Sequence, residues 1–203
     1  MLKNYLNRKE QIIISAIEIM DERGTNGLTM KEIAHRQGVT EPAIYRHFKS
    51  KQEVILTILE RTAVFDEGLF NTILQNNISA LGAVHFFIES YTTYYESYPE
   101  LITIFFSFDA YRYDQETMQM MQAIHEQREA FLCQVIEEGI AAGRINQTMN
   151  ASQYAKLLMG QVWATLYHWK MNYCQGSVKQ EMMMNIEWIL ERMKGLQKEE
   201  RRD

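Results

Sequence analysis

Apolar residues recur at three- and four-residue spacing along nearly the whole chain, and this spacing constrains the fold more than any other feature. It places apolar side chains on one face of an α-helix, whereas a half-buried strand would alternate them every second residue. Only two prolines and ten glycines interrupt the 203 residues, and β-branched runs with an alternating pattern are absent. We therefore predict an all-α protein.

Capping and helix-ending residues divide this pattern into nine predicted helices. Gly24 and Gly38 stand where helices should stop, and Thr29 and Ser50 where helices should begin. The predicted helices cover residues 8 to 23, 29 to 37, 41 to 48, 51 to beyond 70, 79 to 97, 99 to 111, 115 to 142, 150 to 173 and 179 to 196. No Gly-, Ser- or Pro-rich linker separates them, so we expect the parts of the chain to move together.

The formal net charge of −5 is unevenly distributed along the chain. Residues 1 to 61 carry five Lys and five Arg against eight acidic residues, which gives +2. Residues 62 to 203 carry eleven basic residues against eighteen acidic ones, which gives −7. One attractive and one repulsive end would orient the molecule on a polyanion, so the asymmetry modestly favours a nucleic acid partner for the N-terminal part.

Several classes of function lack their sequence signals. No signal peptide and no membrane-spanning stretch is recognisable, so we expect a cytoplasmic protein without membrane contact. Cys133 and Cys174 lack the spacing of a zinc or redox pair, and we expect both to be reduced. His85, His125 and His168 form no metal motif, and no phosphate loop or nucleophile elbow occurs. We expect no metal, no cofactor and no enzymatic activity.

The segment from Thr29 to Lys51 has the spacing of a helix-turn-helix. Ala34 stands where two helices would cross, and a larger side chain would push them apart. Gly38, four residues later, fits a turn that needs a positive φ. Six residues beyond it, Ile44 can close a small core with Ile33 and Val39, which leaves the second helix projecting from the surface.

Capping signals support the same two helices. Thr29 and Glu32 form a capping-box pattern, in which each side chain satisfies a backbone donor of the first turn. Thr40 can cap the second helix, and Pro42 is tolerated because the amide that it lacks belongs to the unpaired first turn.

At this point the chain resembles the tetracycline-repressor (TetR) family of transcription regulators. The matching positions are Met20 to Gly24, Thr29, Ile33-Ala34, Gly38-Val39-Thr40, Pro42, Ile44-Tyr45, His47-Phe48 and Lys51. The resemblance is strong over residues 8 to 60, and beyond them it rests on helical character and length. It implies a helix-turn-helix DNA-binding domain over residues 1 to 50, a ligand-binding and dimerisation domain over residues 51 to 203, and usually repression.

Carried over to this sequence, the resemblance assigns roles within the DNA-binding segment. The expected phosphate contacts are Thr29, Thr40, Tyr45, His47 and Lys51, which would fix position rather than sequence preference. The expected base-reading residues are Glu41, Pro42, Ala43 and Arg46. Pro42 departs from the glycine that the family often has, which puts the fit in the groove in question. Tyr45 and Phe48 could instead be core aromatics, and for Phe48 we favour the core.

Aromatic and methionine side chains accumulate downstream and could line a cavity for an apolar or aromatic molecule. Our candidate ligand-binding residues are Phe86, Tyr91, Tyr94, Phe105, Phe108, Met121, Trp163 and Tyr167. An ordinary hydrophobic core would explain any one of them equally well. That this part of the chain holds an effector pocket is implied mainly by the resemblance.

The last two predicted long helices carry more apolar surface than one core needs, and we interpret them as the interface of a homodimer. The alternative is that both helices pack only within one subunit. We expect a repressor that grips a palindromic operator and releases it when a small apolar or aromatic effector binds. An effector-independent or activating regulator and an all-α enzyme or carrier with a borrowed helix-turn-helix remain the rival hypotheses.

Overall fold

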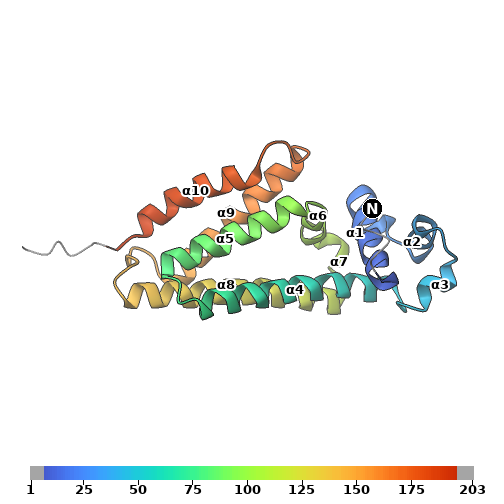
Figure 1. The fold of residues 1–203 in the computed structure, drawn as a ribbon, viewed down its shortest axis with the longest axis horizontal. Coiled ribbons are helices and arrows are strands. Elements are labelled where there is room, and N and C mark those ends of the chain that lie inside the picture. The colour runs from blue at the N-terminus through green and yellow to red at the C-terminus, as the bar shows by residue number, and fades with distance from the viewer. Residues whose placement is uncertain (1–6, 196–203) are drawn as a thin grey trace, which may run out of the picture. The chain divides into compact units, whose positions relative to one another are not determined.

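The computed structural model describes residues 7–195, and within this range the chain is built from ten helices without a strand (Figure 1). The helices are α1 (Arg8–Gly27), α2 (Met30–Gln37), α3 (Glu41–Tyr45), α4 (Lys51–Gln75), α5 (Ala80–Ser97), α6 (Glu100–Phe106), α7 (Phe108–Tyr111), α8 (Gln115–Ala141), α9 (Ala151–Met171) and α10 (Val178–Met193). The prediction of an all-α fold is confirmed.

The described chain forms two compact units, which are not the two segments on either side of residue 50. Unit 1 contains residues 7–65 and 98–124, and unit 2 contains residues 66–97 and 125–195. Helices α4 and α8 each contribute residues to both units. The functional boundary at residue 50 stays a prediction.

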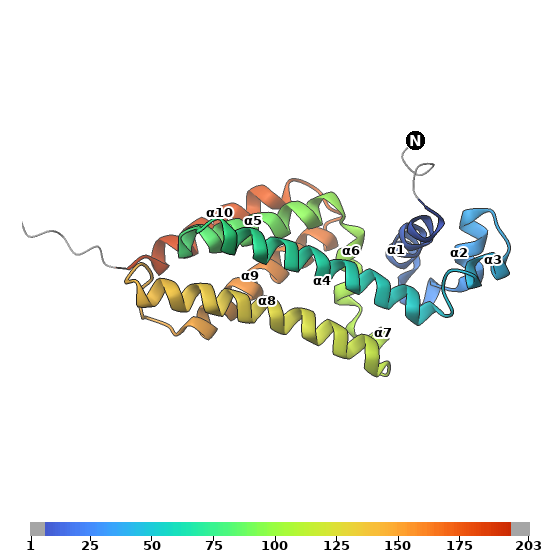
Figure 2. The same cartoon turned by 60° about the horizontal axis from the view of Figure 1, so that its bottom comes forward.

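Unit 1 is built around α1, which packs against α2 and α6. Helices α2 and α3 pack on each other and lie side by side in both views (Figures 1 and 2). The core of this unit includes four fully buried isoleucines, Ile12, Ile13, Ile19 and Ile33. The apolar residues at three- and four-residue spacing in α1 thus form a buried face.

In unit 2, α10 packs along α5 and also contacts α9 (Figure 2). Helix α9 begins at a complete capping box, in which Asn150 accepts from the Gln153 amide at 2.9 Å and the Gln153 side chain accepts from the Asn150 amide at 3.0 Å. Cys133 and Cys174 are not joined by a disulfide. Within residues 7–195, no helix combines the length and apolarity needed to cross a bilayer.

Most predicted helix ends agree with the structure. Helical geometry in α1 is broken at Gly24, where φ is 67° and ψ is 177°, and α2 ends at Gly38. Helix α3 is shorter than predicted, since it ends at Tyr45 rather than Phe48. The predicted end of the last helix, residue 196, lies outside the described residues.

The predicted helix over residues 99 to 111 is wrong as a single element, because the chain breaks at Ser107 into α6 and α7. The Ser107 hydroxyl donates to the Thr103 carbonyl at 2.7 Å, while the Ser107 amide turns to the Ile104 carbonyl at 3.3 Å. A serine hydroxyl that takes the carbonyl four residues back competes with the helical hydrogen bond and favours such a break.

Candidate nucleic-acid interface and the buried cluster of unit 2

The turn between α2 and α3 has the geometry of a helix-turn-helix. Gly38 adopts the left-handed conformation, with φ of 64° and ψ of 32°, and the Val39 amide donates to the Ala34 carbonyl at 3.0 Å. Ala34 and Ile44 are 3% and 1% exposed, so α2 and α3 meet through the small core that the spacing predicted. A left-handed residue is inexpensive for glycine alone, which explains why Gly38 stands here.

The caps of these helices agree only in part with the sequence pattern. The Thr29 hydroxyl accepts from the Glu32 amide at 3.0 Å, as predicted, while the Glu32 carboxylate pairs with Arg23 at 3.0 Å. Thr40 precedes α3 but makes no side-chain capping bond. Its hydroxyl is therefore not committed to the helix end and stays on the exposed surface.

Helix α3 has an inner and an outer face. Phe48 is 1% exposed, so the prediction that it belongs to the core is confirmed. Tyr45 is 48% exposed, and Arg46 and His47 beside it are also exposed. The other predicted DNA-binding residues, Thr29, Thr40, Glu41, Pro42, Ala43 and Lys51, are exposed or half-buried. No member of the predicted set is thus fully buried, and its residues lie on α3, on the turns around it, at the cap of α2 and at the start of α4.

A surface cavity of about 480 Å³ gathers several of these residues beside α3. Its lining includes the predicted residues Thr29, Glu41, Tyr45 and Lys51. It also includes two lysines that the sequence reasoning missed, Lys31 and Lys49. Lys31 lies within the capping-box segment Thr29 to Glu32, and Lys49 lies two residues before Lys51. These positions were the available signal, since basic residues at a capped helix start suit an anion.

Lys51 makes a hydrogen bond to α1 within unit 1. Its ammonium group donates to the backbone carbonyl of Thr25, the residue after the break in α1. Burial lowers the pKa of Lys51 below its ordinary value, because a half-buried ammonium group loses hydration. The position of this cation is thus fixed by the last turn of α1.

Side-chain contacts hold α2 against α1. Arg36 pairs with Glu22 through both of its terminal nitrogens, and with Glu18 at 3.6 Å. The pKa of Glu22 is lowered, chiefly by its hydrogen bond with Arg36. Gln37 donates to the Gln11 carbonyl at 3.1 Å and to the Ser15 hydroxyl. These bonds cross-link the frame that presents α3.

Unit 1 also connects this frame to the helices that follow it. The Thr103 hydroxyl on α6 donates to the Asp21 carboxylate on α1 at 2.5 Å. The Gln52 amide on α4 donates to Asp114 at 2.9 Å and to Glu116 at 3.1 Å, just before and at the start of α8. The first turns of α4 and α8 and the end of α1 are thus held within one compact unit.

Unit 2 contains a buried ion pair between Asp66 of α4 and Arg128 of α8. The guanidinium donates through Nε to Oδ2 at 2.7 Å and through Nη2 to Oδ1 at 3.0 Å. Both side chains are 1% exposed. Two parallel charge-assisted hydrogen bonds are the geometry in which such a buried pair compensates best for lost hydration.

Aromatic side chains enclose this pair. The Arg128 guanidinium lies 4.6 Å from the ring centre of Tyr91 and 5.9 Å from that of Trp163, and it donates to the Tyr95 hydroxyl at 3.4 Å. The Tyr91 hydroxyl donates to Asp66. Burial raises the pKa of both tyrosines, so both remain protonated and able to donate. We call Asp66, Arg128, Tyr91, Tyr95 and Trp163 the buried cluster.

The candidate ligand-binding residues are divided between the two units. Tyr91 and Trp163 belong to the buried cluster, and Tyr94 contacts it through Tyr95, with ring centres 5.4 Å apart. Phe86 and Tyr167 lie elsewhere in unit 2, and Phe105, Phe108 and Met121 belong to unit 1. Phe108 is 56% exposed and Tyr167 45%, so neither is a core residue.

Sequence reasoning missed the two charged members of the buried cluster. Asp66 and Arg128 each lie on an otherwise apolar helix face, with Leu69 and Ile73 following Asp66 and Ile124 and Phe131 flanking Arg128. A charge at helical spacing among apolar residues was the available signal, because a charge is seldom buried unless it is paired.

Helices α9 and α10 leave large apolar side chains exposed. The exposed residues are Leu157, Tyr167 and Met171 on α9 and Met184 and Trp188 on α10, each at least 45% exposed. Their spacing follows a helix face, and Gly160 and Ala164 between them are small and exposed. Scattered apolar residues on a surface are ordinary, but a row along each of two helices is typical of an interface.

Together, the projecting α3, its capped partner α2 and the all-α remainder define a helix-turn-helix protein. The family described as "Bacterial regulatory proteins, tetR family" matches residues 12–58, which include α2 and α3. The resemblance inferred from Thr29 to Lys51 is confirmed.

Similar proteins carry the names of regulators. The chain is 44% identical over 54 residues to the HTH-type transcriptional activator FasR of Mycolicibacterium smegmatis, a match of 27% of this chain and 25% of that relative. The chain thus spans about a quarter of the length of this relative. Over 166 residues it is 23% identical to the fatty acid metabolism regulator protein of Bacillus subtilis, which covers 80% of this chain and 83% of the relative.

A solved structure shows that the likeness of fold extends beyond the helix-turn-helix. The ketosteroid transcriptional regulator KstR2 of Mycobacterium tuberculosis has a TM-score of 0.80 at 16% identity, covering 93% of this chain and 95% of that one. Its likeness concerns the fold. The names of these relatives agree with the expectation of a regulator rather than an enzyme.

Proposed function

We propose that the protein is a sequence-specific DNA-binding transcription regulator that represses by holding a palindromic operator. The observation that carries the proposal is the outer surface of α3 and of the turn that follows it, where Tyr45, Arg46 and His47 are exposed. Ile44 and Phe48 anchor the same segment in the core. A short helix held in this way presents side chains to the major groove without losing its place in the core. Tyr45 and His47 suit phosphates, and Arg46 suits the acceptor edge of guanine.

The cavity beside α3 supports the same assignment. Lys31, Lys49 and Lys51 line it together with the cap residue Thr29 and Met30, the first residue of α2. Phosphate oxygens favour both basic side chains and helix starts. Glu41 at its edge would face a base rather than the backbone, because a carboxylate accepts from the cytosine amino group.

The proposed effector is a small, largely apolar or aromatic molecule that binds in unit 2. Support comes from the buried cluster, whose aromatic walls surround a charge pair that an apolar core does not need. The solved structure of the transcriptional regulator FadR from Bacillus subtilis is a complex with stearoyl-CoA, and its sequence is 21% identical to that of this chain. A ligand with an apolar body and one polar group would fit the combination of aromatic rings, Asp66 and Arg128.

Two subunits would associate through α9 and α10. The exposed row with Leu157 and Met171 on α9 and Trp188 on α10 supports this arrangement. A two-fold pair of such helices forms a four-helix bundle and presents two copies of α3 to successive half-sites. The twofold symmetry of the dimer is the reason to expect a palindrome.

Release would follow from a change in α4. Asp66 lies on this helix in unit 2, and Gln52 and Lys51 at its start contact residues of unit 1. An effector that binds one arrangement of α4 more tightly shifts the population of the dimer toward it. Operator affinity then falls through the spacing of the two α3 helices, without loss of a base contact.

An electrophoretic mobility-shift assay with DNA from upstream of its own gene tests the proposal. We expect saturable binding that survives an excess of scrambled competitor at moderate salt. The Arg46→Ala variant should lose the preference for operator over scrambled DNA. The Val64→Glu variant, changed at an exposed site on α4, should retain it. Equal affinity of the wild-type protein for scrambled DNA would refute the assignment.

A further inference from the structure

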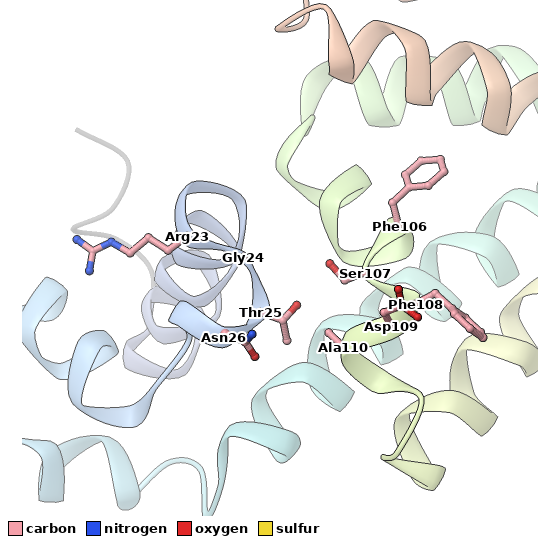
Figure 3. A pocket seen from close by; sticks show the side chains of 9 residues that line it. All are labelled: Arg23, Gly24, Thr25, Asn26, Phe106, Ser107, Phe108, Asp109 and Ala110. Atoms are coloured by element: carbon pink, nitrogen blue, oxygen red, sulfur yellow. The ribbon is translucent and has the colours of Figure 1, made fainter.

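A second cavity of unit 1 lies where α1 ends against the junction of α6 and α7. Its volume is about 330 Å³, and its lining residues are Arg23, Gly24, Thr25 and Asn26 of α1 and Phe106 to Ala110 of the junction. In Figure 3, Thr25 extends from α1 toward Ser107 and Ala110, whereas Arg23 extends away from them. The cavity is therefore bordered by hydroxyl groups rather than by the guanidinium of Arg23, which pairs with Glu32.

Two buried hydroxyl groups at this place lie near each other without a well-formed hydrogen bond. Thr25 is 7% exposed and Tyr111 1%, and within the described residues neither Thr25 Oγ1 nor the Tyr111 hydroxyl makes a hydrogen bond of good geometry. Burial raises the pKa of Tyr111 to about 12, and the nearby Thr25 hydroxyl lowers it in part. Buried hydroxyl groups without partners are rare, because each loses its bonds to water without replacement.

We propose that this cavity is a binding site for a small uncharged molecule that carries a hydroxyl or carbonyl group. The polar group of the ligand would bond with Thr25 Oγ1, and its apolar part would lie against Ala110 and the backbone of the junction, because the rings of Phe106 and Phe108 extend away from Thr25 (Figure 3). A charged ligand would find no buried opposite charge here, since Asp109 is highly exposed and Arg23 is turned away. The volume is at the lower end for ligand pockets, which suits a molecule of about ten non-hydrogen atoms.

Occupation of the site would act on the nucleic-acid interface through one residue. The carbonyl of Thr25 accepts the hydrogen bond from Lys51, and Asn26 lines both this cavity and the one beside α3. A ligand that pulls on the Thr25 side chain therefore displaces the acceptor that positions Lys51. This second step rests on the proposed function, whereas binding itself does not.

The experiment measures the binding of phenol and cyclohexanol to the full-length protein without DNA by ligand-observed NMR, with benzoate as the charged comparison. We expect both alcohols to bind in the range of about 1 mM, and benzoate at least tenfold more weakly. Thr25→Val should weaken phenol binding at least fivefold, and Ala110→Phe, which fills the cavity, should abolish it. The matched control is Ala123→Phe at an exposed site on α8, which should bind phenol as the wild type does.

The outcomes separate the site from its consequence. Equal binding of phenol to wild type and Ala110→Phe, or no binding to the wild type, overturns the site. If the site stands, phenol should lower operator affinity at least threefold in the wild type and leave it unchanged in Ala110→Phe. Phenol binding without any change in operator affinity overturns the link to Lys51, and a protein without operator binding would leave the NMR result intact.

Discussion

Arg128 on α8 donates two parallel hydrogen bonds to Asp66 on α4, at 2.7 and 3.0 Å, with both side chains 1% exposed. The pair joins the two helices that contribute to both compact units. Loss of one partner leaves an uncompensated buried charge, whereas loss of both can be nearly neutral. The pair thus constrains the arrangement of α4 and α8 more than it adds net stability.

Asp66→Leu and Arg128→Met should each lower the free energy of unfolding by about 3–5 kcal/mol, because each strands a buried charge. The double variant should recover most of this loss. Urea unfolding followed by circular dichroism gives the values, and Lys156→Ala, which removes an exposed pair with Glu129 at 3.7 Å, should shift stability by less than about 1 kcal/mol. Additive losses in the double variant would contradict the interpretation.

Arg46→Ala should reduce operator discrimination by about 1–3 kcal/mol and relax the preference at one base pair of each half-site. Tyr45→Phe should instead weaken binding to all sequences alike, because it removes only a phosphate donor. Competition binding with a set of single-base operator variants distinguishes the two. If Arg46→Ala weakened binding to all operator variants equally, Arg46 would contact the DNA phosphates rather than a base.

Operator affinity should fall as pH rises, and the fall should begin at a lower pH than a lysine of ordinary pKa would give. Burial lowers the pKa of Lys51, so the free protein loses this charge below the ordinary value of 10.5. Since a phosphate favours the charged form, binding at alkaline pH takes up a proton, and affinity falls once pH exceeds the lowered pKa.

The measurement compares binding between about pH 8 and 10 for the wild type and Lys51→Arg, since arginine stays protonated throughout. The decline should be present in the wild type and smaller in the variant. Parallel curves would show that Lys51 does not contact phosphate. Circular dichroism at each pH controls for unfolding.

Trp188→Glu should convert the protein to a monomer and reduce operator affinity. Trp188 is 59% exposed on α10, and the substitution replaces a large apolar side chain of the proposed interface with a charged one that loses hydration there. Val64→Glu, at a residue on α4 that is 68% exposed, is the matched control and should leave the dimer intact. Size-exclusion chromatography with light scattering measures the mass. If Trp188→Glu remained a dimer, the interface would not include Trp188.

Thr25→Val should raise the stability of the free protein or leave it unchanged, although it removes a polar group from unit 1. The Thr25 hydroxyl is buried without a hydrogen-bond partner in the described chain, so a methyl group of similar shape removes a desolvation penalty of roughly 1 kcal/mol. Thermal unfolding would detect the change. A loss of more than about 1 kcal/mol would mean that the hydroxyl already has a partner in the native protein.

The sequence predicted the helix-turn-helix far better than the buried cluster, and the reason is the range of the interactions involved. Gly38 and the cap at Thr29 act over a few residues, so their spacing alone defines α2, the turn and the start of α3. The break at Ser107 is equally local, but a serine hydroxyl has several possible acceptors, and the pattern could not select the Thr103 carbonyl.

The buried cluster depends on contacts between residues far apart in sequence. Asp66 and Arg128 are 62 residues apart, and either could have paired elsewhere or faced solvent. Likewise, Tyr91 and Tyr167 are equal as aromatic candidates in the sequence, but only Tyr91 is buried. Composition indicates that an aromatic core exists, whereas the packing of helices decides which side chains it contains.

The break in α1 has a consequence for variants at Gly24. A side chain at this position would meet no atom within 4 Å, so space is available, but φ of 67° with ψ of 177° is a conformation that L-residues avoid. Alanine, valine and leucine should therefore be similarly harmful here, whereas at Ala34, which is 3% exposed, harm should grow with side-chain volume. A comparison of the two size series would separate a torsional requirement from a steric one.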